Sequence, residues 1–100
     1  MEIKHMATAG TLESSDVMIT VEPEVDGLEL IIESPVLHQY GAKIRDVVLN
    51  VLSALQVDKG RISVMDRGAL DCTIKARVET ALYRSADASE ANIPWGGSVR

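Results

Sequence analysis

The chain has 100 residues, the length of one domain, and 46% of them are hydrophobic, which suits a folded globule rather than a disordered chain. Its net charge of -5 argues against a nucleic-acid partner, because phosphate backbones are bound by basic patches. With one cysteine, Cys72, an intrachain disulfide is excluded, and neither a membrane-spanning run nor a signal-peptide core is evident. We therefore expect a cytoplasmic protein, with residues 1–100 forming a single domain that binds neither nucleic acid nor membranes.

Apolar residues in the first third of the chain alternate, as in half-buried strands. We expect a weak strand over residues 6–12 and stronger strands over residues 17–22 and 28–33. A short loop that contains Gly27 joins the two stronger strands, a pattern typical of a β-hairpin. Their inward-facing residues would be Val17, Ile19, Val21, Leu28, Leu30 and Ile32.

The next segment has the pattern of an amphipathic helix. Ser34-Pro35 predicts its start, since serine suits the N-cap and proline suits the first helical position. Apolar residues then recur every three or four positions until the helix ends near Leu55. The stripe consists of Val36, Tyr40, Ile44, Val47, Val48, Val51, Leu52 and Leu55.

Two further elements follow the helix. Residues 61–66 alternate again and predict a strand. Residues 69–78 are ambiguous, because their alternation fits a strand while their spacing also fits a helix. The alternation fails after Val78 and the helical stripe continues, so the pattern favours a helix from about Leu70 to Ser85.

The predicted order, β-β-β-α-β-α, indicates an α+β fold. The simplest way to bury the apolar faces is a two-layer sandwich, with both helices packed on one face of a small antiparallel or mixed sheet of three or four strands. The sequence does not reveal the strand order. We expect residues 1–5 and 88–100 to be flexible, with Trp95 as the residue that would anchor the C-terminal segment.

The turn formed by residues 13–16 is the candidate functional stretch. Its short polar side chains hydrogen-bond their own backbone readily, so the hydroxyls of Ser14 and Ser15 are expected to be exposed. Glu13 and Asp16 would be solvated, which argues against a catalytic carboxylate pair. By themselves, these residues favour an ordinary hairpin turn that contains serines.

The other polar residues form no recognisable chemical pattern. His5 and His38 are far apart in the sequence, and no metal-ligand spacing occurs, so we predict no metal site. Cys72 has no obvious basic neighbour except Lys75 and is interpreted as structural or inert. Arg77 belongs either to a docking surface or to a solvated face, and we favour the solvated face.

The order of several motifs resembles one known family. Residues 10–19, Gly-Thr-Leu-Glu-Ser-Ser-Asp-Val-Met-Ile, resemble the N-terminal signature of the citrate lyase acyl carrier proteins, the gamma subunits of citrate lyase. The resemblance continues through Gln39-Tyr40-Gly41, Asp66–Cys72, Ala76-Arg77-Val78 and Ile93-Pro94-Trp95. It therefore spans nearly all of the chain, and several motifs in order are more specific than one.

The resemblance implies an acyl carrier with no catalytic residue of its own. Ser14 would be joined by a phosphodiester to an arm derived from triphosphoribosyl-dephospho-CoA, and Ser15 is the less favoured site because relatives also have glycine there. The arm's thiol would carry acetyl and citryl groups while citrate is cleaved to acetate and oxaloacetate. The implied partners are the citrate lyase alpha subunit (acyl transferase), the beta subunit (citryl lyase), the prosthetic-group transferase and the acetylating ligase.

Three alternatives remain open from the sequence. A malonate decarboxylase carrier uses a related arm and a similar layout, although residues 10–15 and 68–72 favour citrate lyase. A small non-catalytic α+β binding or regulatory domain would have no arm. A small hydrolase would use Ser14 as a nucleophile, but no nucleophile-elbow pattern surrounds it.

Overall fold

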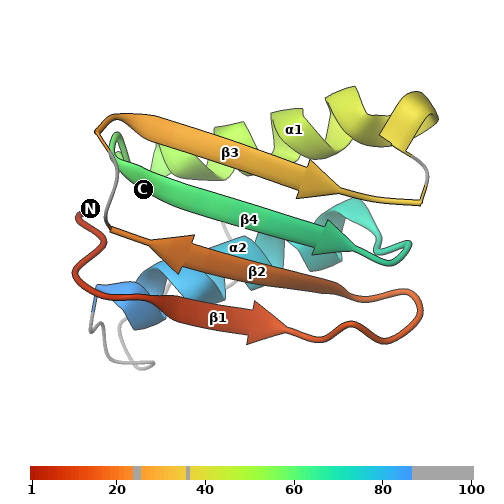
Figure 1. Ribbon diagram of the computed structural model, residues 1–100, viewed down its shortest axis with the longest axis horizontal. Helices are drawn as coiled ribbons and strands as arrows, with labels where there is room; N and C mark the ends of the chain where they lie inside the picture. The colour runs from red at the N-terminus through yellow and green to blue at the C-terminus, as the bar shows by residue number, and fades with distance from the viewer. Residues whose placement is uncertain (24–25, 36, 87–100) are drawn as a thin grey trace.

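In the computed structural model, which describes residues 1–23, 26–35 and 37–86, a four-stranded sheet is covered on one face by two helices (Figure 1). The elements in chain order are β1 (Ala7–Gly10), β2 (Val17–Glu22), β3 (Leu28–Glu33), α1 (Leu37–Ala54), β4 (Gly60–Asp66) and α2 (Asp71–Ser85). The predicted two-layer α+β sandwich is confirmed, with a mixed sheet. Neither helix in the described part of the chain has the length and apolar character needed to cross a membrane.

The strand order is β1-β2-β4-β3, so the predicted hairpin between β2 and β3 is wrong. β4 lies between these two strands, antiparallel to β2 and parallel to β3. The reason is the helix: α1 carries the chain from the end of β3 back to the start of β4, and such a crossover places the two strands side by side in parallel. Ile62 and Val64 of β4 are almost fully buried, which suits the central position, whereas β3 forms an edge.

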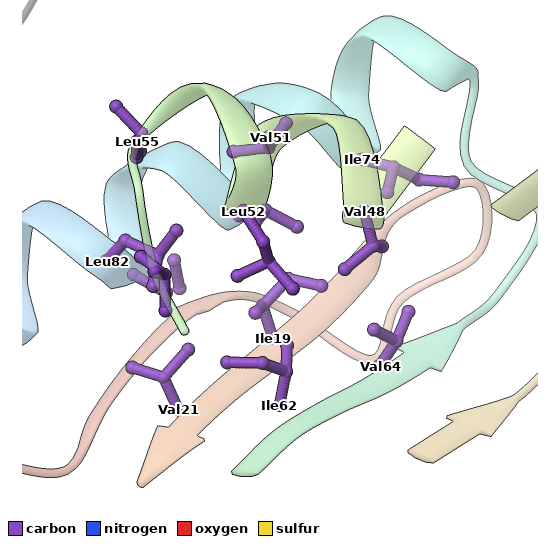
Figure 2. Close-up of a cluster of buried hydrophobic side chains, with 14 of the residues drawn as sticks. Ile19, Val21, Val48, Val51, Leu52, Leu55, Ile62, Val64, Ile74 and Leu82 are labelled. Atoms are coloured by element: carbon purple, nitrogen blue, oxygen red, sulfur yellow. The ribbon is translucent and has the colours of Figure 1, made fainter. Parts of the chain in front are cut away.

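The core lies between the sheet and the two helices, and Figure 2 shows its aliphatic side chains. Val17, Ile19 and Val21 of β2 are all fully buried, as the alternation predicts. β3 contributes less, because Leu30 and Ile32 are only partly buried. Leu28, predicted to face inward, is exposed, since it lies at the start of an edge strand.

α1 buries most of its predicted stripe but begins later than expected. It starts at Leu37 rather than at Pro35, and the hydroxyl of Ser34 donates a hydrogen bond to Asp66 Oδ2 at 2.8 Å. The buried stripe residues are Ile44, Val48, Val51, Leu52 and Leu55, whereas Val47 is only partly buried. Val36 and the side chain of Tyr40 lie outside the described residues.

α2 resolves the ambiguity over residues 69–78 in favour of a helix, as we preferred. It packs over β1 and β2 and also against α1, burying Ile74, Val78 and Leu82. The same helix buries Glu79, whose two carboxylate oxygens have no hydrogen-bond partner among the described residues. Burial therefore raises the pKa of Glu79, and the nearby charge of Lys75 opposes this only in part.

The N-terminal segment, expected to be flexible, lies against the core. Ile3 is buried in the hydrophobic cluster, and the N-terminal ammonium of Met1 donates to the carbonyl of Leu55 at 2.9 Å. The mobility of residues 1–5 stays a prediction for hydrogen exchange to measure. The expectations for residues 88–100, including Trp95, lie outside the described residues.

Candidate functional site

The candidate site is the serine loop, residues 11–16, which joins β1 to β2 as predicted. The loop lies at the same end of the sheet as the turn from β4 to α2 (Figure 1). Its residues from Leu12 to Ser15 are all exposed. A group attached to a side chain here would extend into solvent without disturbing the core.

The backbone of the loop has two conformations that constrain its sequence. Gly10 has φ 89°, and a Cβ added there would overlap the carbonyl oxygen of Val17. Only glycine therefore allows the two strands to approach so closely where the loop begins. Ser15 has φ 65°, a left-handed conformation that glycine adopts more easily than serine does.

Backbone hydrogen bonds join the serine loop to the turn after β4. The N–H of Ser15 donates to the carbonyl of Arg67 at 2.7 Å, and the N–H of Arg67 donates to the carbonyl of Asp16 at 2.9 Å. Within the loop, the N–H of Asp16 donates to the carbonyl of Glu13 at 3.1 Å. The loop is thus held on both sides although its side chains are exposed.

The carboxylate of Asp16 fixes the loop from within. Its Oδ2 accepts from the Thr11 hydroxyl at 2.7 Å, and its Oδ1 accepts from the N–H of Val17 at 2.8 Å. The guanidinium of Arg77, from α2, donates to the same carboxylate at 3.2 Å and 3.3 Å. The Thr11 bond, then the Val17 bond and more weakly Arg77 lower the pKa of Asp16 to about 2.

The turn that supports the loop is itself fixed by a buried carboxylate. Asp66 Oδ1 accepts from the backbone N–H groups of Gly68 and Ala69 at 3.1 Å and 2.9 Å. Its Oδ2 accepts from the Ser34 hydroxyl at the end of β3. Since Arg67 lies within this turn, Asp66 determines where the carbonyl that accepts from Ser15 is placed.

Ser14 and Ser15 differ in how the structure uses them. The N–H of Ser15 supports the loop, and its backbone is left-handed. The hydroxyl of Ser14 is exposed and forms no hydrogen bond among the described residues. The two serines thus differ in their backbone, because only Ser15 has a left-handed conformation and a backbone hydrogen bond to Arg67, and the choice of Ser14 as the attachment residue stays a prediction.

Sequence reasoning missed two supports of the loop. Arg77 was expected on a solvated face, and its side chain is 41% exposed, but the sequence did not reveal that its guanidinium binds Asp16 across 61 residues of sequence. Asp16 was expected to be solvated, which is wrong, because its side chain is only 15% exposed and three donors converge on its carboxylate. A single sequence has no local signal for a pair that α2 brings together with the loop.

The other candidate residues form no second site in the described part of the chain. His5 Nδ1 lies 3.0 Å from the carbonyl oxygen of Met6, and the side chain of His38 is outside the description. Cys72 is exposed at the start of α2. No group of three or more His, Cys, Asp or Glu side chains that could hold a metal ion occurs among the described residues.

The exposed Ser14 lies on a supported loop and lines neither of the two hollows next to α2 in the described part of the chain, an arrangement suited to carrying an attached group. The family model described as "ACP: Malonate decarboxylase delta subunit (MdcD)" matches residues 4–85, so the class is that of acyl carrier proteins. The chain is similar to the citrate lyase acyl carrier protein of Vibrio cholerae serotype O1, with 49% identity over 95% of this chain and 96% of the relative.

Two further relatives bear the same name. The citrate lyase acyl carrier protein of Lacticaseibacillus casei is 49% identical over 87% of this chain and 86% of its own length. That of Rhodopseudomonas palustris is 44% identical over 95% of this chain and 96% of its own. The chain belongs to the citrate lyase acyl carrier protein family, as the motifs of the sequence indicate.

Proposed function

We propose that this chain is the acyl carrier subunit of a citrate lyase complex and carries acetyl and citryl groups on an arm attached to Ser14. The arm is derived from triphosphoribosyl-dephospho-CoA, and when attached it supplies a thiol that holds the acyl group as a thioester. Citrate is cleaved by the partners, the alpha subunit as acyl transferase and the beta subunit as citryl lyase. The complex works in the cytoplasm, where a prosthetic-group transferase and an acetylating ligase prepare the arm.

The observation that carries this proposal is the exposed hydroxyl of Ser14 on a loop held by backbone bonds to Arg67. The residues around it fit a phosphodiester, because the nearby charge of Asp16 is already paired with Arg77. Glu13, the other acid of the loop, is exposed and solvated. A phosphodiester at Ser14 therefore meets no unpaired buried carboxylate in the described part of the chain.

The same geometry argues against a hydrolase that uses Ser14. A serine nucleophile needs a general base within hydrogen-bonding distance. The Ser14 hydroxyl has no such partner among the described residues, and it lies on an open loop rather than in a pocket. Ser14 is therefore proposed as an attachment point, with all catalysis in the partner subunits.

Peptide-level mass spectrometry tests the attachment residue. The bare protein, Ser14→Ala and Ser15→Gly are incubated with the attachment enzyme and its activated arm. We expect the arm on Ser14 in the unmodified sequence and in Ser15→Gly, and no arm on Ser14→Ala. Ser15→Gly is a matched control, because glycine suits the φ of 65° at that position.

The outcomes separate the alternatives. An arm on Ser15 in the Ser14→Ala variant would show that the wrong hydroxyl had been assigned. If the protein without substitutions accepted no arm, the proposed carrier function would be wrong. Citrate cleavage by the isolated, arm-bearing chain, even with magnesium, would contradict the assignment of catalysis to the partners.

A further inference from the structure

A groove runs between α1 and α2, starting at the turn that joins β4 to α2. Its first part has a volume of about 610 Å³ and lies between Lys43 and Ile44 of α1 and the start of α2. Its second part, of about 410 Å³, continues between Val47 and Val51 of α1 and Lys75 of α2. Asp71 and Cys72 line both parts, so the two hollows are neighbours. Volumes of this size are typical of small-molecule sites.

The groove begins next to the serine loop. Gly68 and Ala69 line its first part, and they directly follow Arg67 in the chain. Arg67 accepts the 2.7 Å hydrogen bond from the N–H of Ser15. A group attached to Ser14 therefore starts beside the mouth of the groove.

We propose that the groove between α1 and α2 is a docking site for the nucleotide-derived arm attached to Ser14. This inference rests on the proposed function. In this docked state the arm would fold back over the turn at Gly68. Its uncharged portion would lie along the apolar walls, and its phosphates would lie near Lys43. The carrier then has a docked state and an extended state, and the docked state shields the thioester from water.

The chemistry of the walls matches the arm. Ile44, Val47 and Val51 supply apolar surface, while Lys43 and Lys75 supply positive charge next to the carboxylate of Asp71. Lys43 is paired with Asp71 at 3.2 Å, but 65% of the lysine side chain is exposed. Such an exposed pair is weak, so a phosphate group competes for the lysine at little cost.

The covalent tether allows a weak site to be occupied. A short flexible connection holds a group at an effective concentration of about 1 mM near a neighbouring site. If the dissociation constant of the free arm were about tenfold below this effective concentration, the groove would be filled about nine-tenths of the time. Modest affinity also lets the arm leave when a partner subunit binds it.

Cys72 provides the measurement, because it is exposed in the bare protein and lines both parts of the groove. The rate of Cys72 alkylation by iodoacetamide is followed by peptide mass spectrometry, which separates Cys72 from the arm's thiol. We expect the arm-bearing protein to react about 10-fold more slowly than the bare protein, because this occupancy leaves about one-tenth of the Cys72 thiol accessible. The amide chemical shifts of the residues that line the groove should also differ between the bare and the arm-bearing protein.

A pair of charge variants tests the contact with Lys43. Lys43→Gln should restore part of the Cys72 reactivity in the arm-bearing protein. Lys59→Gln is the matched control, because Lys59 is also exposed but lies at a different hollow, near the N-terminus. It should leave the protection unchanged, and equal effects of the two variants would overturn the placement of the phosphates.

The intact mass distinguishes failure of docking from failure of the proposed function. An arm on Ser14 with unchanged Cys72 reactivity and shifts confined to residues 11–16 would overturn the docking site and leave the carrier function intact. Protection of Cys72 in the bare protein by added lyase subunits, but not by the arm, would make the groove a protein interface instead. Absence of any arm would overturn both proposals.

Discussion

The serine loop and the hydrophobic core between the sheet and the helices are both well ordered, but different forces hold them. In the core, aliphatic side chains such as Ile19 and Leu52 are almost completely excluded from water. In the loop, the side chains from Leu12 to Ser15 are exposed, and the position of the backbone depends on hydrogen bonds to Arg67 and to the carboxylate of Asp16. Stability is thus concentrated in one region and the proposed chemistry in the other.

This separation suits a carrier. Burial provides most of the free energy of folding, whereas directional bonds define geometry at a modest net stabilisation each. A loop defined by such bonds can present a modified serine to several enzymes without involving the core. Substitutions in the two regions should therefore differ in what they change, stability in one and attachment in the other.

The largest loss of stability is expected from a substitution in the hydrophobic core. Leu52→Ala should lower the free energy of unfolding by roughly 2–5 kcal/mol, since the side chain is 1% exposed and its loss leaves a cavity. Leu70→Ala is the matched control, because Leu70 is 71% exposed and should change stability by less than about 0.5 kcal/mol. Urea unfolding measures both, and similar costs would mean that α1 does not pack as described.

Gly10 links the two regions, and its replacement comes next. Gly10→Ala should cost roughly 2–4 kcal/mol, because the methyl group overlaps the carbonyl of Val17 and the φ of 89° is unfavourable for alanine. Gly27→Ala separates the two causes, since Gly27 has φ 79° but open space around its Cβ position. Gly27→Ala should cost about 1 kcal/mol. An equal cost for both substitutions would mean that the contact between residue 10 and the carbonyl of Val17 does not contribute.

The two regions should respond oppositely to pH through their carboxylates. The pKa of Asp16 is lowered from 3.8 to about 2, so its stabilisation is present above pH 3.8 and lost as the pH falls towards 2. The pKa of Glu79 is raised above 4.5 by burial, so its stabilisation is present below pH 4.5 and lost as the pH rises through the folded-state pKa.

Urea unfolding of Asp16→Asn and Glu79→Gln across pH tests this contrast. Asp16→Asn should be less stable than the unmodified sequence near neutral pH, and the difference should close as the pH approaches 2. Glu79→Gln should gain relative stability as the pH rises above 4.5. Curves for both variants that run parallel to that of the unsubstituted protein would contradict the assignment.

The smallest effect on stability is expected at the attachment residue. Ser14→Ala should change the free energy of unfolding by less than about 0.5 kcal/mol, because the side chain is exposed and supports nothing among the described residues. Thermal unfolding measures it. A clear loss of stability would mean that the hydroxyl has a structural role and would weaken its assignment as a free attachment point.

Sequence periodicity predicted the elements well because it reports burial. The alternation of residues 17–22 and the helical stripe of residues 37–54 both arise from one face packed on the core. The pairing of strands was predicted less well. The short loop at Gly27 suggested a hairpin, but which strand lies next to β2 depends on the competition between β3 and the more completely buried β4.

The site was predictable as far as it is local. The turn at residues 13–16 and its exposed serines follow from composition, and the choice of Ser14 came from the family resemblance. The support from Arg77 and from the turn at Asp66 arises only when α2 and β4 reach the loop. Such contacts leave no trace in the neighbourhood of either residue, so a single sequence does not contain them.

The place of β4 in the sheet also has a consequence for synthesis on the ribosome. β1 and β2 can pair as soon as both have emerged, but one edge of β2 and one edge of β3 receive their partner only when β4 follows α1. Until then the nascent chain exposes the backbone of both edges, which favours pairing with other chains. The release of β4 from the exit tunnel is therefore the step that completes the sheet and covers these two edges.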